Sequence, residues 1–306
     1  MRTKSSDGVR RVRHRRVLLL AALGAMLALA AVSATARATP GPAPLPPGSM
    51  ALARSAPATF ATPAVPGVAP AVDAPICGFG ACFDYVAGRQ FAFASGASVQ
   101  LWEARPEIDP NDIPNEHSLQ ELAVQSTDGS QIVEIGWTVD KGLNGDLAPH
   151  LFIFHWVDNI PTCYNGCGFV QTSTAVTPGM RLPSGHLGTF QIDHVGDRWE
   201  LSLDGTMFGY FPDALWGTSV FTQPLLIQAF GEVASTSAPT CNDMGTGKFA
   251  DSAASSQISG FKLLNSTTPA DLFAPGFELV TSPDWYTASD ETPTSFRLGG
   301  PGSGAC

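Results

Sequence analysis

Short runs of alternating polar and apolar residues, separated by turn residues, fill the chain from about Phe83 to its end. Asp-Gly pairs at 128–129 and 204–205 each separate two such runs, which is typical of β-hairpins. Further strands are expected at 151–157, 188–195 and 258–264. No long segment of this region has a helical period. The pattern predicts one all-β domain of about 225 residues, a β-sandwich or jelly-roll built from antiparallel strands.

The first 36 residues have the composition of an export signal peptide. A basic stretch ends at Arg16, an apolar run extends from Val17 to Val32, and small residues then provide a cleavage site. The apolar run is shorter than the roughly 20 residues that a membrane span needs. We expect secretion to the extracellular space and no stable membrane association after the signal is removed; an uncleaved membrane anchor is the alternative.

Residues 37–75 are rich in proline, alanine, glycine, serine and threonine and contain hardly any charge. Such a segment cannot bury enough apolar surface to order itself. We interpret it as a disordered linker or a short pro-segment that precedes a domain of residues 76–306.

The charge of the chain argues against two classes of partner. The formal net charge is −10 overall, and residues 37–306 contain 10 basic and 26 acidic residues. A strongly acidic surface repels nucleic acid and anionic membranes. We therefore expect no nucleic-acid partner.

Two glutamates lie within strand-like runs where an ionised carboxylate is costly unless it is used or compensated. In the run 131–139, alternate residues from Val133 to Val139 form an apolar face, and Glu134 lies on the opposite face. In the run 225–233, Glu232 shares a face with Gln228 and Phe230. A pair of carboxyls on one sheet can provide an acid and a base. The alternative is that both glutamates simply face water.

Six cysteines in an exported chain suggest disulfides. Two pairs are close in sequence, and the remaining two cysteines would form a long-range pair: Cys77 with Cys82, Cys163 with Cys167, and Cys241 with Cys306. Six cysteines allow 15 pairings, which the spacing alone does not resolve. A metal site is the alternative for each close pair, but neither spacing is CxxC and no histidine cluster accompanies them.

Several blocks taken together resemble one known family. Glu134-Ile-Gly-Trp137, Cys163-Tyr-Asn-Gly-Cys167-Gly-Phe-Val-Gln171 and Phe230-Gly-Glu-Val233 follow one another in this order. The set is similar to the neprosin family of secreted glutamic peptidases, and the resemblance covers about residues 98–306. Each block alone would be a weak signal.

The resemblance implies an antiparallel β-sandwich of two curved sheets, jelly-roll or concanavalin-like, with a catalytic dyad at Glu134 and Glu232. It implies a prolyl endopeptidase that is active in acid without metal or cofactor and acts on peptides or proteins, proline-rich ones included. It also implies a Cys163–Cys167 disulfide. The family's usual partner position for Cys306, near residues 284–286, holds no cysteine here, so we propose Cys241 instead. We expect a monomer.

Hydrolysis of a peptide by two carboxyls requires one ionised and one protonated group, which predicts a bell-shaped pH–rate curve centred below neutrality. Gln171 or Gln228 could donate an amide hydrogen bond to the oxyanion, although an ordinary strand hydrogen bond is the simpler interpretation of each. Aromatic residues are candidates by type for a proline pocket, although Trp137 falls on the expected core face: Trp137, Tyr164, Tyr210 and Phe230. Three histidines are expected at the surface: His117, His186 and His194.

Two other classes of function use similar features. A β-sandwich glycosidase also uses paired carboxylates, but the closely spaced E-x-D-x-E motif is absent. A lectin-like binding module would need neither glutamate for turnover. The chain contains no G-x-S-x-G and no HExxH, which argues against a serine hydrolase and a metallopeptidase.

Overall fold

The computed structural model describes residues 74–78, 80–110, 116–236, 238–273, 279–304 and 306. The expected export signal (1–36) and nearly all of the segment 37–75 lie outside the described residues. The domain expected from residue 76 onward begins with a strand at Ile76. The described residues are almost entirely β-strand, as the sequence predicts.

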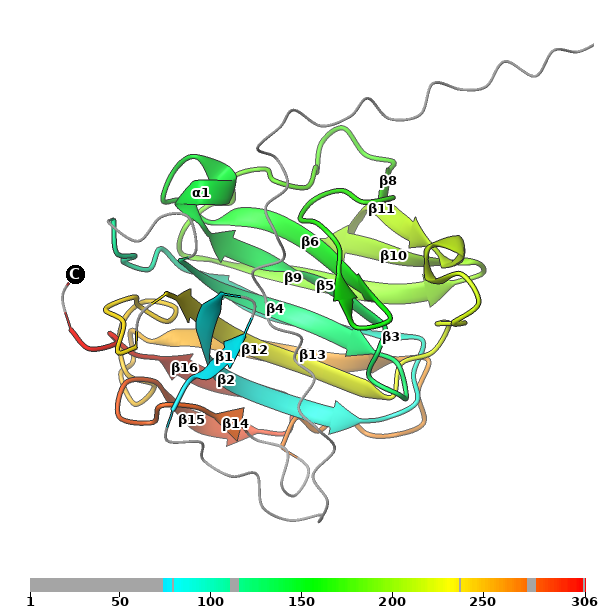
Figure 1. The fold of residues 1–306 in the computed structure, drawn as a ribbon. Coiled ribbons are helices and arrows are strands. Elements are labelled where there is room, and N and C mark those ends of the chain that lie inside the picture. The colour runs from blue at the N-terminus through cyan, green and yellow to red at the C-terminus, as the bar shows by residue number, and fades with distance from the viewer. Residues whose placement is uncertain (1–73, 79, 111–115, 237, 274–278, 305) are drawn as a thin grey trace, which may run out of the picture. The chain divides into compact units, whose positions relative to one another are not determined.

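Two antiparallel sheets of eight strands each form the described part of the chain (Figure 1). The first sheet has the order β1-β2-β12-β4-β5-β6-β7, and β14 pairs with β2. Its strands are β1 (Ile76–Gly78), β2 (Ala81–Phe91), β4 (His117–Gln125), β5 (Ile132–Val139), β6 (His150–Val157), β7 (Ile160–Pro161), β12 (Leu226–Ser235) and β14 (Leu279–Val280).

The second sheet has the order β15-β16-β13-β3-β9-β10-β11-β8. Its strands are β3 (Gly96–Glu103), β8 (Val170–Gln171), β9 (His186–Val195), β10 (Arg198–Leu203), β11 (Thr206–Pro212), β13 (Ser256–Leu264), β15 (Thr287–Thr292) and β16 (Ser295–Gly299). The expected strands at 151–157, 188–195 and 258–264 are confirmed within β6, β9 and β13.

The main hydrophobic core lies between the two sheets. It contains the alternate residues Val133, Ile135, Trp137 and Val139 of β5 together with residues of the second sheet such as Phe190. The apolar face expected for the run 131–139 is therefore the inner face of the first sheet. Side chains at the intervening positions of β5 point to the outer face, because successive side chains of a strand alternate.

Both Asp-Gly pairs lie in hairpin connections. Asp204 and Gly205 join β10 to β11 as a two-residue loop, in which both residues have positive φ, 48° and 76°. This is the backbone that a type I′ turn requires. Asp128 and Gly129 lie in the longer connection between β4 and β5, where the Asp128 carboxylate accepts hydrogen bonds from Ser126 and Ser130.

Helices are short in the described residues. Helix α1 (Lys141–Asn144) begins after Asp140, whose carboxylate accepts a hydrogen bond from the backbone N–H of Leu143 at 2.8 Å. The other is a 3-10 turn, η1 (Asp213–Trp216). None of the described helices is long and apolar enough to cross a membrane.

All six cysteines form disulfides, in the three pairs Cys77–Cys82, Cys163–Cys167 and Cys241–Cys306. The pairing expected for Cys306 is thus confirmed. The Cys163–Cys167 loop is held against β6, because Asn165 and Ile153 exchange hydrogen bonds at 3.0 and 3.1 Å. Three disulfides are compatible with a secreted protein.

Candidate active site

Glu134 and Glu232 lie on the same face of the first sheet, the face turned away from the second sheet. Glu232 of β12 is paired with Leu119 of β4, and Glu134 of β5 is paired with Ala123 of β4. The two glutamates are therefore separated by a single strand, β4. Each side chain is only 1% exposed. Residues that are 98 positions apart in the sequence thus lie close together on one sheet face.

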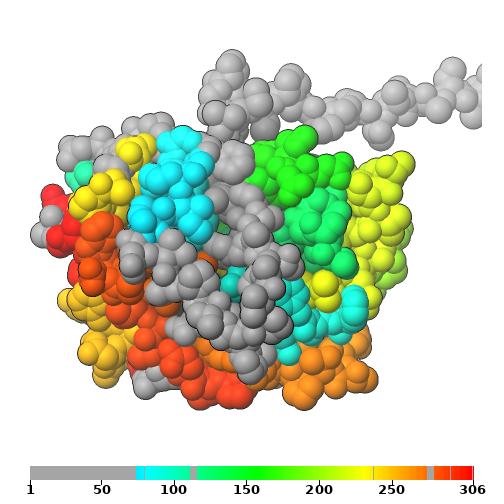
Figure 2. Space-filling view, turned by 60° about the horizontal axis from the view of Figure 1, so that its bottom comes forward, coloured from blue at the N-terminus to red at the C-terminus, as the bar shows by residue number. Residues whose placement is uncertain are grey.

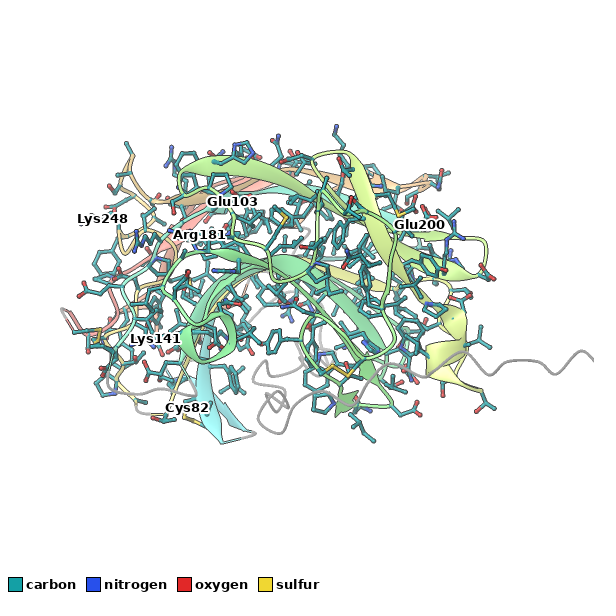
Figure 3. All side chains as sticks on the ribbon, turned by 90° about the horizontal axis from the view of Figure 1, so that it is seen from above. Cys82, Glu103, Lys141, Arg181, Glu200 and Lys248 are labelled. Carbon is teal, nitrogen blue, oxygen red and sulfur yellow. A yellow bond between two sulfur atoms is a disulfide. The ribbon has the colours of Figure 1, made fainter. Side chains whose placement is uncertain are left out.

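A second hydrophobic cluster surrounds these glutamates on the outer face. Its members are mostly large side chains from the strands that carry or flank the pair: Phe83, Tyr85, Leu119, Ile132, Phe152, Phe154, Trp156, Tyr164 and Phe230. The first sheet curls strongly (Figure 3), which turns the side chains of its outer face toward one another. The cluster gives the two carboxyls an environment of low polarity, which disfavours their ionised forms.

Glu232 lies beside two polar side chains. His117 of β4 lies with Nε2 2.8 Å from Glu232 Oε1, and both side chains are buried. Tyr85 is directly opposite Glu232 on β2. Burial, followed by the negative charge of Glu232, raises the pKa of Tyr85 well above its usual range, so the tyrosine hydroxyl keeps its proton beside Glu232. Neighbouring donors of this kind suit an ionised carboxylate.

Glu134 has a different environment. Its Oε1 accepts one hydrogen bond from Trp156 Nε1 at 3.0 Å, whereas its Oε2 is buried and has no partner among the described residues. Burial, and then the charge of Glu232, raises the pKa of Glu134 to about 8, although the Trp156 hydrogen bond opposes this shift. The environment of Glu134 therefore favours its protonated form.

A third glutamate, Glu121 of β4, lies on the same face and was missed by the sequence reasoning. It is paired with Phe230 of β12 and with Gly136 of β5, and it is 1% exposed. In the sequence it marks only the beginning of a hairpin strand. Glu121 lies two residues after Leu119, so the alternation of side chains along β4 places both on the outer face. This could have been recognised only if the expected strand had begun at His117.

His117 corrects an expectation. The sequence favours a surface position, but the side chain is fully buried and contacts Glu232. Its burial follows from the place of β4 between β12 and β5, which no local pattern reveals. His186 is about half exposed, as expected, whereas His194 is largely buried and contacts both carboxylate oxygens of Asp213 at 3.0 Å.

Of the two glutamine candidates, only Gln228 lies on the face that carries the glutamates. Gln228 is fully buried on the outer face of β12, in register with Ala123, which is itself the partner of Glu134. Gln171 is exposed on β8 in the second sheet and donates to the carbonyl of Ser173. Gln171 is therefore not part of the site.

Of the four aromatic candidates, two lie beside the glutamates and two lie elsewhere. Tyr164 and Phe230 belong to the cluster around the glutamates, and Tyr164 packs against Phe154 with ring centroids 5.0 Å apart. Trp137 lies in the core between the sheets. Tyr210 lies in the second sheet, where the Arg198 guanidinium stacks over its ring at 4.8 Å. Tyr164 and Phe230 thus remain as candidates, and Phe152 and Phe154 join them.

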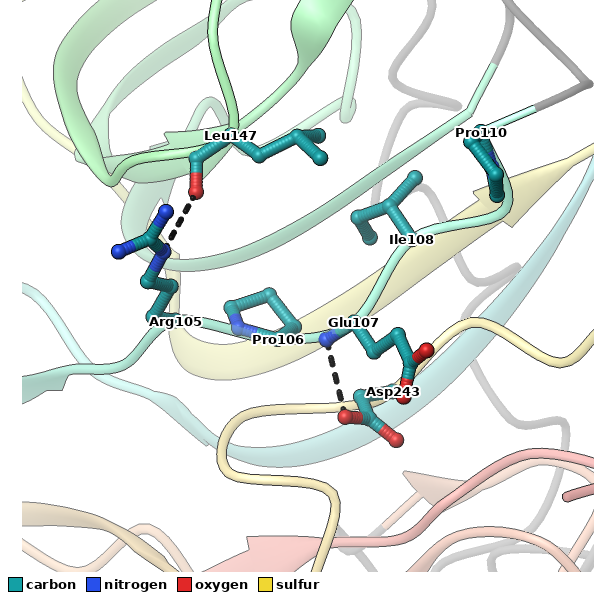
Figure 4. A pocket seen from close by; sticks show the side chains of 7 residues that line it. All are labelled: Arg105, Pro106, Glu107, Ile108, Pro110, Leu147 and Asp243. Atoms are coloured by element: carbon teal, nitrogen blue, oxygen red, sulfur yellow. Dashed lines mark hydrogen bonds between the residues drawn. The ribbon is translucent and has the colours of Figure 1, made fainter. Parts of the chain in front are cut away.

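A separate open cavity of about 470 Å³ is lined by residues outside the strands that carry the glutamates (Figure 4). Arg105 donates to the carbonyl of Leu147 at 3.2 Å, and Asp243 accepts from the backbone N–H of Glu107 at 2.9 Å. These hydrogen bonds connect the segment that contains Arg105 and Glu107 to the loops that contain Leu147 and Asp243. At the edge of the first sheet β14 pairs with β2, and the orange and red C-terminal residues lie beside the cyan ones in Figure 2.

Comparison with solved structures gives matches with TM-scores below 0.5. They include a scytalido-glutamic peptidase bound to a peptide-based transition state analog (8% identity, TM-score 0.39, 71% of this chain and 96% of that chain). They also include SCP-B, a peptidase of the eqolisin family bound to the tripeptide Ala-Ile-His (7% identity, TM-score 0.38, 70% and 96%) and a Bacillus licheniformis β-glucanase (10% identity, TM-score 0.31, 56% and 89%). The neprosin family model matches residues 114–301, which include all three glutamates. The chain belongs to the neprosin family.

Proposed function

We propose that this protein is a secreted glutamic endopeptidase, active in acid, that hydrolyses peptide bonds after proline by means of a water-activating dyad formed by Glu134 and Glu232. Membership of the neprosin family supports a peptidase. The observation that carries the proposal is a pair of buried glutamates on one sheet face whose environments differ: Glu232 lies beside His117 and Tyr85, and Glu134 has a raised pKa. The enzyme acts as a monomer on peptides and proteins, proline-rich ones included.

The different environments assign a role to each glutamate. Glu232, which lies beside His117 and Tyr85, is the carboxylate that accepts a proton from water as the water oxygen attacks the carbonyl carbon. Glu134 is the acid: its Oε2 has no hydrogen-bond partner among the described residues, and it donates its proton to the carbonyl oxygen. When the carbon–nitrogen bond breaks, Glu232 gives its proton to the leaving amine and the hydroxyl of the intermediate returns a proton to Glu134. Both groups then have their starting charges.

Gln228 can supply an additional donor to the oxygen that becomes negatively charged. Its buried side chain lies on the same face as the glutamates. Gln228 pairs with Ala123 of β4, and Ala123 pairs with Glu134 of β5, so one strand lies between Gln228 and Glu134. A neutral amide fixed by the strand needs no reorganisation during the reaction, which is the property that makes such donors effective.

Preference for proline is supported by the walls of the outer face. Phe152, Phe154, Tyr164 and Phe230 provide aromatic surface close to the glutamates. The pyrrolidine ring is compact and apolar, and its ring stacks favourably on aromatic faces. Tyr164 lies within the short loop that the Cys163–Cys167 disulfide closes, and this disulfide restricts the position of its ring.

The pH dependence follows from the pKa of Glu134. Because the reaction needs one protonated and one ionised carboxyl, kcat/KM should fall as pH rises through the raised Glu134 pKa of about 8 and fall again in acid, where a pair of carboxyls becomes fully protonated. The plot of kcat/KM against pH is thus bell-shaped, with activity in the acid range. It is measured as kcat/KM with a fluorogenic proline peptide; a rate that keeps rising above about pH 8 would contradict the assignment.

Substrate class is tested with the mature enzyme and a matched panel. Peptides with proline, and the same peptides with alanine in its place, are incubated across roughly pH 3 to 8 beside β-glucans. We expect cleavage on the carboxyl side of proline, identified by mass spectrometry of the products. Cleavage of glucan without cleavage of peptide would establish the glycosidase instead. Equal cleavage of the alanine peptides would leave a glutamic peptidase but remove the proline preference.

A further inference from the structure

Glu121 occupies the position between the two glutamates of the dyad. Its partner on β12 is Phe230, and Glu232 lies two residues further along that strand. Its partner on β5 is Gly136, and Glu134 lies two residues before it. Glu121 is therefore the diagonal neighbour of both glutamates on one face. Diagonal neighbours have Cβ atoms about 7–8 Å apart or slightly closer, within reach of long side chains.

The surroundings of Glu121 disfavour a negative charge. The side chain is 1% exposed, and no lysine, arginine or histidine forms an ion pair with it in the described part of the chain. Its Oε2 is buried without a hydrogen-bond partner among the described residues. Burial, and then the charges of Glu134 and Glu232, raise the pKa of Glu121 well above its usual range. An ionised Glu121 beside an ionised Glu232 would be an uncompensated buried charge.

The two residues paired with Glu121, Gly136 and Phe230, offer no polar side chain, which leaves the carboxyls of the dyad as hydrogen-bond partners for Glu121. Gly136 offers no side chain that could hydrogen-bond Glu121, and an added Cβ there would approach the Glu121 Cβ to 2.8 Å, so only glycine lets β5 lie this close to Glu121. Phe230, the partner on the other side, carries no polar group. A protonated carboxyl in this position has a donor and needs an acceptor. The ionised carboxylate of the dyad is the strongest acceptor within reach.

We propose that Glu121 is a third carboxyl of the site, a positioning residue that stays protonated between Glu134 and Glu232 and donates its proton in a hydrogen bond to whichever of them is ionised. The inference rests on the proposed function. The competent site then holds three carboxyls, two protons and one negative charge. Glu121 forms and breaks no covalent bond to the substrate, and it stabilises the carboxylate that activates water.

Two substitutions separate this role from simple filling of space. Glu121→Leu keeps the approximate volume but removes the donor, and we expect kcat/KM to fall about 10- to 100-fold because a hydrogen bond to a charged group is lost. The acid limb of the pH profile should move to higher pH, since the ionised carboxylate of the pair loses a donor. Glu121→Gln retains an amide donor and should restore most of the rate and the position of that limb. An E121L enzyme with the wild-type rate and profile would overturn the proposal.

The protonation state is tested directly and without turnover. An infrared difference spectrum between wild type and E121Q at neutral pH should show the carbonyl band of a protonated carboxyl lost from the wild type. Loss of carboxylate bands instead would overturn the proposal even if E121L fails to fold. If wild type cleaves no peptide, the proposed function fails while this spectrum still reports the proton of Glu121, so the two failures are distinguishable.

Glu103→Gln is the matched control. Glu103 of β3 is also 1% exposed, and burial, with Asp204 contributing, raises its pKa to about 8. It belongs to the second sheet, on the far side of the first sheet from the dyad (Figure 3). E103Q should lose its own protonated carbonyl band and keep the wild-type pH profile. A shift of the acid limb in E103Q equal to that of E121L would contradict the assignment.

Discussion

Glu232→Gln is expected to lower kcat/KM for a proline peptide by at least about 10³-fold while the fold stays intact. Glutamine has nearly the shape of glutamate and its amide oxygen still accepts a hydrogen bond from His117, but it cannot take a proton from water. Glu134→Gln should cause a loss of similar size, because the amide can donate a hydrogen bond to the carbonyl oxygen but cannot transfer the proton. Both losses should appear mainly in kcat, since both substitutions preserve shape and hydrogen-bonding atoms.

The control for these variants is again Glu103→Gln, which changes a glutamate of equal burial outside the site. Its rate should match that of wild type. Circular dichroism and the unfolding midpoint establish that each variant is folded. A folded E232Q or E134Q enzyme with more than about a tenth of the wild-type rate would be incompatible with acid–base roles for these residues.

Removal of the Cys241–Cys306 disulfide, with both cysteines replaced by serine, is expected to lower the free energy of unfolding by about 4 kcal/mol. The bond joins residues 65 positions apart, so its loss releases a long loop in the unfolded chain. The C-terminal residues it secures contact the chain near Thr240: Ser303 donates to the Thr240 carbonyl at 2.8 Å, and Met244 and Gly300 form a β-bridge. The measurement is urea unfolding of the variant and wild type under identical conditions.

Cys77 and Cys82 provide the matched control for this stability effect. They are separated by only 5 residues, and the same loop-entropy relation gives about 2 kcal/mol for their replacement by serine. The ratio between the two effects is therefore the informative quantity. Equal losses for both pairs would show that chain entropy is not the source of the stabilisation.

Local alternation was sufficient to predict much of the fold and the faces of both dyad residues. Side chains along a strand alternate with a period of two, so the apolar set from Val133 to Val139 fixes Glu134 on the outer face without knowledge of the neighbouring strands. Turn chemistry predicted the β10–β11 connection in the same local way, because Asp204 and Gly205 tolerate positive φ.

The other members of the site depend on pairing between distant segments. β4 lies between β5, its neighbour in sequence, and β12, which follows about a hundred residues later. His117 contacts Glu232 across 115 positions, and no local pattern contains that contact. Polar residues on both faces of β4, such as Gln120 inward and Glu121 outward, also conceal which face is buried. Burial of polar side chains in this strand is a consequence of topology.

The central claim is that Glu134 and Glu232 act as one unit in peptide hydrolysis. A cycle of kcat/KM values for wild type, E134Q, E232Q and the double variant on one proline peptide tests it most directly. Since removing either member disables the unit, the double variant should be no slower than the slower single variant, within about threefold. Losses that multiply in the double variant, or a single variant that keeps the wild-type rate, would contradict the account.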